Sequence, residues 1–208
     1  ADAAMARLIG RVSGAQAIAA PADFRDAGSI AQMVDQFARQ AGRIDAVIHC
    51  GIAGAPGVAG PFAARDPAGF AAHAALVLGS FQSLCCAALP HLAKQGGTII
   101  GFASDAGRFA APRQAVVGAA FGGIMAFVRN LSLEVAHQGV RVHCLSPSFV
   151  ADTTVYTANA ARAEAASARA GLGLPSPADI APLALFLCGP GAAKMTGQVI
   201  SINGGLNA

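Results

Sequence analysis

The sequence has few of the residues that carry charge or aromatic chemistry. Its 208 residues include no Trp and one Tyr, and only 12% are charged against 54% that are hydrophobic. The 14 basic residues are scattered without interleaved aromatic residues, so no nucleic-acid partner is expected. No apolar run of about eighteen residues is free of Gly, Pro and charge, and no signal peptide is evident. We therefore expect a cytoplasmic protein without a membrane partner.

The five Cys residues form no metal-binding or disulfide pattern. They are Cys50, Cys85, Cys86, Cys144 and Cys188. Their number is odd, no Cys-x-x-Cys occurs, and no His lies at ligand spacing. We therefore expect free thiols in a reducing compartment and no metal site.

Apolar strands alternate with amphipathic helices along the chain. Strands are expected at 16–20, 45–49, 98–103, 140–145 and 199–202, and helices at 1–12, 29–41, 66–95, 115–137, 158–170 and 176–188. This alternation predicts a single α/β domain over residues 1–208. The expected architecture is a Rossmann-like, doubly wound parallel sheet with helices on both faces.

Several short segments follow one another in a recognisable order. They are Asp23, GRIDAVIH at 42–49, LVLGSF at 76–81, GGTIIGFAS at 96–104, GVRVHCLSPSFVADT at 139–153, PADIAPLALFL at 177–187 and TGQVISINGG at 196–205. Together they resemble the short-chain dehydrogenase/reductase family from its third strand onward. The family's first strands and its Gly-rich turn, which binds the cofactor pyrophosphate, do not occur in the sequence. We therefore expect no cofactor-binding residue in this chain, with Asp23 as a vestige of adenine contact.

The catalytic positions of the family are altered. The resemblance places the catalytic Ser at Ser104, the Tyr at Val117, the Lys at Phe121 and the Asn at Leu76. In the family the Tyr exchanges a proton with the substrate oxygen, and the Lys lowers the pKa of that Tyr. Val and Phe can do neither, so we expect no catalytic residue, with Ser104 vestigial.

Two His residues occupy positions at which the family has Asn. We expect His49 and His143 to fill the former cofactor space and to form local hydrogen bonds. Asp105 follows Ser104 directly, and we expect the two side chains to face apart.

Two nearly uncharged helices correspond to those that form a four-helix subunit interface in the family. The candidate interface residues are Leu78, Phe81, Val117, Phe121, Ile124 and Met125. Their low polarity favours an obligate contact, because such interfaces resemble a protein core.

These features predict a non-catalytic subunit of a hetero-oligomer, expected to be a heterotetramer. An intact paralogue would bind NAD and transfer the hydride, with an aromatic hydroxyacyl-CoA as a candidate substrate. Two alternatives stay open: a self-sufficient oxidoreductase with a relocated acid/base, and a homomeric ligand-binding or regulatory protein.

Overall fold

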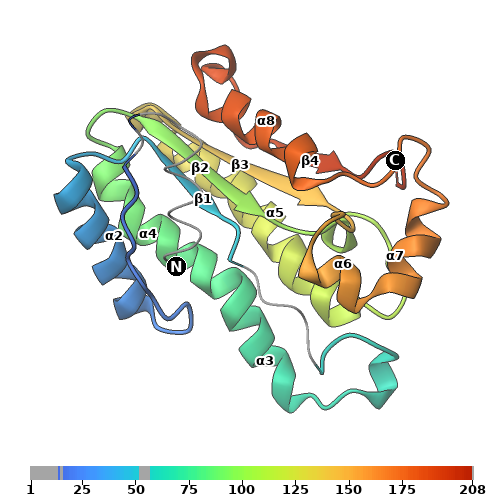
Figure 1. Ribbon diagram of the computed structural model, residues 1–208. Coiled ribbons are helices and arrows are strands. Elements are labelled where there is room, and N and C mark those ends of the chain that lie inside the picture. Colours follow the sequence, from blue (N-terminus) through green and yellow to red (C-terminus); the bar gives the residue numbers. More distant parts are fainter. Residues whose placement is uncertain (1–13, 15, 52–56, 208) are drawn as a thin grey trace.

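The computed structural model describes residue 14 and residues 16–51 and 57–207 (Figure 1). Four parallel strands form one sheet in the order β1-β2-β3-β4. The strands are β1 (Ala46–His49), β2 (Gly97–Phe102), β3 (Val140–Pro147) and β4 (Val199–Ile202). The predicted α/β fold with a parallel sheet is confirmed. The expected helix at 1–12 lies outside the described residues.

Helices cover both faces of this sheet (Figure 1). The helices α2 (Ala27–Ala41), α4 (Ser80–Leu92) and α5 (Ala115–Val135) share one core with one face, and α8 (Pro177–Cys188) packs on the other. The short helices are α3 (Ala68–Ala74), α6 (Thr154–Ala158) and α7 (Ala160–Ser167), with a π-helical turn η2 (Ala75–Gly79) between α3 and α4. Single 3-10 turns are η1 (Phe62–Ala64), η3 (Asp105–Gly107), η4 (Ala136–Gln138) and η5 (Pro190–Ala192).

The ends of the helices follow signals in the sequence. The Asp26 carboxylate accepts a hydrogen bond from the Gly28 N–H at the start of α2, and Gly42, at φ 79°, ends that helix. Ser176 and Asp179 form a capping box at the start of α8. These caps satisfy backbone groups that helix ends otherwise leave unpaired.

The sheet packs closely against α4. A Cβ atom on Gly101 in β2 would lie 2.7 Å from the Phe81 ring, so only glycine allows this helix to approach so closely. Phe81 is fully buried there, and its ring lies 5.8 Å from that of Phe127 on α5. The two helices and the sheet thus share one apolar core.

β1 is an edge strand. It pairs only with β2, and within the described part of the chain no strand lies on its outer side. Its predicted burial is confirmed for His49 alone: Ile48 pairs with Ile100 and so points to the face of the sheet on which α8 packs, yet at this edge it is 45% exposed. The strand expected at 16–20 is wrong: described residues there have no strand structure, since they have no neighbouring strand to pair with.

Two helical stretches are long and apolar enough to cross a membrane by length and composition, although glycine interrupts both. They are Ala68–Leu92, which runs through α3, η2 and α4, and Ala115–Gln138, which contains α5. Both place a stripe of side chains in the core of the sheet. Core helices of α/β proteins pass the same test.

We predict that Ile124→Ala lowers the free energy of unfolding by about 2–5 kcal/mol, because the Ile124 side chain is fully buried between α5 and the sheet. The matched control is Leu133→Ala on the same helix. Leu133 is 79% exposed, so its truncation should cost less than about 0.5 kcal/mol. Urea unfolding monitored by circular dichroism measures both values. Equal losses would contradict the packing described for α5.

Candidate functional site

A cleft of about 720 Å³ lies at the carboxyl ends of β2 and β3. Loops and helices that follow these strands form its walls, with α5 on one side and α6 and α7 on another (Figure 1). Among its lining residues are Ser104, Val117, Phe121, Pro147 and Ser148. Residues far apart in the sequence that the family resemblance assigns to catalysis or to the nicotinamide border therefore meet in one place. This is where parallel α/β sheets generally bind ligands.

Ser104 lines this cleft, and no base among the described residues is hydrogen-bonded to it. Its Oγ atom accepts a hydrogen bond from the Ala106 N–H at 3.3 Å, which caps the turn η3. The neighbouring Asp105 points away from Ser104, as expected, and is buried. In the described residues no hydrogen bond connects Ser104 to a group that accepts its proton.

Asp105 instead ties the ends of three strands together. Its Oδ1 atom accepts hydrogen bonds from the hydroxyls of Ser146 in β3, at 3.1 Å, and Ser201 in β4, at 2.8 Å. Its Oδ2 atom accepts one from the Asn203 amide at 2.6 Å. Sequence reasoning missed this role, because it considered Asp105 only as a partner for Ser104. The polar residues at the ends of β3 and β4 are the feature of the sequence that could have indicated this role of Asp105.

Val117 and Phe121 occupy the first two turns of α5 and are buried against the cleft. Neither side chain exchanges a proton or forms a hydrogen bond at a reacting oxygen. The described cleft residues therefore present a hydroxyl at Ser104 beside an apolar wall, without the proton donor that the family resemblance implies at this place.

Leu76 lies in the π-helical turn η2, where its carbonyl is drawn into a small polar network. The Ser80 hydroxyl donates to the Leu76 carbonyl, and Ser80 Oγ lies 3.1 Å from Nε2 of His49. Because the single hydroxyl proton points to the carbonyl, His49 must carry its own proton on Nε2 and donate it to Ser80. Burial lowers the pKa of His49, which keeps the ring neutral. The expected local hydrogen bonding is thus confirmed for His49.

His143 behaves differently and corrects the expectation made for it. In β3 it pairs with Ile100 of β2, whose side chain belongs to the core beneath α8, so His143 lies on the opposite face of the sheet from His49. It is fully buried, and among the described residues neither ring nitrogen has a hydrogen-bond partner at ordinary distance and angle, although the Met195 backbone lies near enough to oppose the fall in its pKa. Burial, reinforced by the charge of Arg141, lowers the pKa of His143 to about 4.

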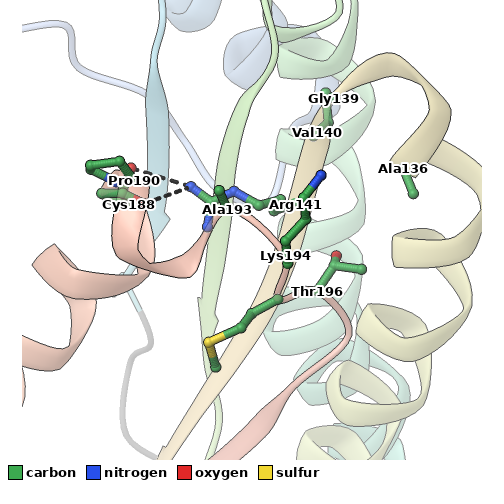
Figure 2. Close-up of a pocket in the computed structure, with 11 residues that line it drawn as sticks. Ala136, Gly139, Val140, Arg141, Cys188, Pro190, Ala193, Lys194 and Thr196 are labelled. Carbon is green, nitrogen blue, oxygen red and sulfur yellow. Dashed lines mark hydrogen bonds between the residues drawn. The ribbon is translucent and has the colours of Figure 1, made fainter.

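A second hollow, of about 540 Å³, lies where β3 meets the end of α8. Figure 2 shows the Arg141 side chain reaching toward the backbone that follows α8. Its guanidinium donates to the carbonyls of Cys188, at 3.3 Å, and Ala192, at 3.1 Å. A cation at the C-terminus of a helix satisfies the last carbonyls and complements the helix dipole. Arg141 therefore has a structural role in this hollow.

The described residues do not fit a nicotinamide dinucleotide. Asp23, the expected vestige of adenine contact, is paired with Arg25 at 2.7 Å, and these hydrogen bonds lower the pKa of Asp23 to about 2. Val117 and Phe121 stand where the family resemblance implies the groups beside the nicotinamide ribose. No step of a reaction is therefore derived through a cofactor held by this chain.

The candidate interface residues lie mostly inside the chain. Phe81, Val117, Phe121, Ile124 and Met125 are each at most 8% exposed, because they form the inner stripe of α4 and α5. Any partner at these helices would meet their outward faces instead. The sequence prediction chose these residues by their low polarity alone, and that criterion selected the side chains that face the core.

We predict that Asp105→Ala lowers the free energy of unfolding by about 3 kcal/mol or more, because it removes the buried acceptor shared by Ser146 of β3 and by Ser201 and Asn203 at the end of β4. Asp45→Ala is the control, since Asp45 forms only an exposed pair with Arg43. Thermal and urea unfolding compare the two variants. If Asp105→Ala lowered the free energy of unfolding no more than Asp45→Ala, the role of Asp105 in joining the strand ends would be contradicted.

The buried His143 should make the protein less stable in acid. Its folded pKa, about 4, lies below its ordinary value of 6.5, so the unfolded chain binds more protons between these values. Above pH 6.5 the titration of His143 therefore does not reduce the free energy of unfolding. As the pH falls toward 4, that free energy declines by up to about 3 kcal/mol. His143→Leu should remove this part of the pH dependence without loss of stability at pH 7, since no hydrogen bond is broken.

Urea unfolding of wild type and His143→Leu from pH 4 to pH 8 measures that difference. Parallel stability curves for the two proteins would show that His143 does not titrate as described.

The comparisons with known proteins agree with this architecture. A family model described as enoyl-(acyl carrier protein) reductase matches residues 1–207. The 3-oxoacyl-[acyl-carrier-protein] reductase FabG of Chlamydia trachomatis serovar D is 34% identical over 131 residues, which are 62% of this chain and 53% of that protein. The peroxisomal 2,4-dienoyl-CoA reductase SPS19 of Saccharomyces cerevisiae is 31% identical over 189 residues, or 88% of this chain and 63% of that protein. The chain thus spans about half of the length of the first relative and somewhat more of the second.

Solved structures show the same fold. A dehydrogenase/reductase from Sinorhizobium meliloti 1021 has a TM-score of 0.90 and 26% identity, covering 100% of this chain and 80% of that one. The 7α-hydroxysteroid dehydrogenase solved with NADH and 7-oxo glycochenodeoxycholic acid has a TM-score of 0.86 and 24% identity, covering 98% and 80%, and bears on the fold alone. With a family model matched over residues 1–207, the chain belongs to the short-chain dehydrogenase/reductase family.

Proposed function

We propose that this chain is a non-catalytic subunit of a hetero-oligomeric, NAD-dependent short-chain dehydrogenase. A paralogue with an intact Tyr and Lys binds NAD and transfers the hydride. This chain stabilises the paralogue and contributes to the shape of the assembly. The cofactor and the reaction belong to the partner in this proposal.

The observation that carries the proposal is the apolar wall of the cleft. Val117 and Phe121 are buried beside Ser104, at the positions of the family's proton donor and its activating cation. A hydroxyl without a base or a proton donor does not reduce a carbonyl or oxidise an alcohol. The fold is kept while the groups that the chemistry requires are replaced by side chains that packing favours.

The outward face of α5 supports an assembly role. Exposed residues along its first four turns are Ala115, Ala119 and Ala126, and the first charged residue of the helix is Arg129. Small side chains without charge let a partner helix approach closely and cost little desolvation. A helix with both an apolar inner face and a small, uncharged outer face suits a subunit contact.

The substrate of the complex is proposed to be an aromatic hydroxyacyl-CoA. The names of the two curated relatives give substrates carried on acyl carrier protein and on CoA. The pattern of lost catalytic groups is similar to that of the inactive subunit of 2-[hydroxy(phenyl)methyl]succinyl-CoA dehydrogenase in anaerobic toluene degradation. That likeness supplies the substrate class for the first assays of the complex.

A second candidate function is a self-sufficient oxidoreductase with a relocated acid/base. The observation that favours it is His73, an imidazole that lines the same cleft as Ser104. If this candidate were correct, the purified chain would turn over alone, and Ser104→Ala or His73→Gln would abolish that activity.

Purification of the tagged chain from its native host, followed by mass spectrometry, tests the proposal. We expect a second short-chain dehydrogenase with an intact Tyr and Lys to be recovered in fixed ratio. Activity of the complex should disappear when the Tyr of the paralogue is replaced and survive Ser104→Ala in this chain. A homo-oligomer whose activity depends on Ser104 would contradict the proposal.

A further inference from the structure

We propose that the cleft beside Ser104 is a binding site for a small organic acid with an apolar body, in which His73 supplies a hydrogen bond and Arg162 the charge. The site is a property of this chain and goes beyond its role as a subunit. It requires no reaction, so it is compatible with the loss of the family's catalytic groups.

His73 is a buried polar group without a partner at the cleft. It lies on α3 and is 7% exposed, and among the described residues its Nε2 atom has no hydrogen-bond partner. Burying an imidazole nitrogen without a partner costs free energy, which a hydrogen bond to a ligand would recover. Burial lowers the pKa of His73, so the ring is neutral and can either donate or accept.

The walls of the cleft suit an apolar body. α5 contributes Val117 and Phe121, and the segment that follows β3 contributes Pro147, Phe149 and Val150. Ligand sites in proteins typically combine such apolar walls with a few polar groups that fix orientation. With a volume of about 720 Å³, the cleft has room for a ligand of drug-like size.

Arg162 gives the cleft a positive charge. It lies on α7, lines the cleft, and holds its guanidinium 5.9 Å from the centre of the Phe149 ring. Within the described residues no carboxylate forms an ion pair with it. A guanidinium that stacks on an aromatic ring and keeps its N–H groups free is well suited to a carboxylate.

The combination points to one class of ligand. Apolar walls select a hydrocarbon or aryl body, Arg162 selects an anionic group, and His73 and Ser104 select a further oxygen. A neutral hydrocarbon would leave His73 and Arg162 unused, and a compact inorganic anion would leave the apolar walls exposed. An aryl- or alkyl-carboxylate uses all three features.

Calorimetric titration with 3-phenylpropionate tests the site, with 3-phenylpropanamide as the neutral probe of the same shape. The purified protein is used, together with any subunit that purifies with it, and variants are made in this chain alone. We expect 3-phenylpropionate to bind with a dissociation constant of about 1 mM or lower and the amide about fivefold more weakly. Arg162→Gln should weaken binding of the acid about fivefold, whereas the control Arg169→Gln, an exposed residue just beyond α7, should not.

A second readout reports on His73 without any substitution in the measured protein. In protein labelled with ¹⁵N-histidine, the acid should shift the ring signal of His73 and leave that of the exposed His137 unchanged. Single His→Gln variants assign the signals, and the other four assign His73 by elimination if its own variant does not fold. The proposal is overturned by absence of binding, by equal effects of Arg162→Gln and Arg169→Gln, or by an unmoved His73 signal. None of these outcomes depends on whether a catalytic paralogue is found.

Discussion

The buried carboxylate of Asp105 holds together the end of the sheet at which the cleft lies. It follows β2 and accepts hydrogen bonds from Ser146 of β3 and from Ser201 and Asn203 at the end of β4. A buried charge is tolerated only where several donors surround it, so the three strand ends are fixed relative to one another. Ser104 and the residues that follow β3 are positioned by this tie. The shape of this end of the cleft therefore depends on the hydrogen bonds of Asp105 and not on the side chains that line the cleft.

Under the proposed function, the cleft remains formed although the side chains at the family's catalytic positions differ, because Asp105 and not those side chains joins the strand ends. Val117 and Phe121 extend the core of α5 into the positions that the family resemblance gives to a Tyr and a Lys. The Ser80 hydroxyl, which is hydrogen-bonded to His49, donates to the Leu76 carbonyl in the π-helical turn. Apolar burial stabilises the helix at these positions, whereas a functional Tyr and Lys would need partners and a cofactor. The same cleft keeps His73 and Arg162, and these two side chains support the proposal that it holds a ligand.

Much of the fold followed from the sequence because its signals are local. The periodicity of α2, α5 and α8, with Gly42 and Ser176 at their ends, predicted these helices closely, and the order of short segments predicted the family. What failed depends on contacts across the chain. The face on which His143 lies is set by strand register, and the strand expected at 16–20 had no neighbour to pair with. The roles of Asp105 and His73 arise from residues distant in sequence, so neither could be read from spacing.

The central claim is that this chain lacks the nicotinamide chemistry of its family while keeping the fold. The most direct test is isothermal titration calorimetry of the purified chain with NAD⁺ and with NADH, in the absence of any other subunit. The account predicts no binding of either form, since Asp23 is occupied by Arg25 and the cleft wall at Val117 and Phe121 is apolar. Binding of either form with micromolar affinity would contradict it.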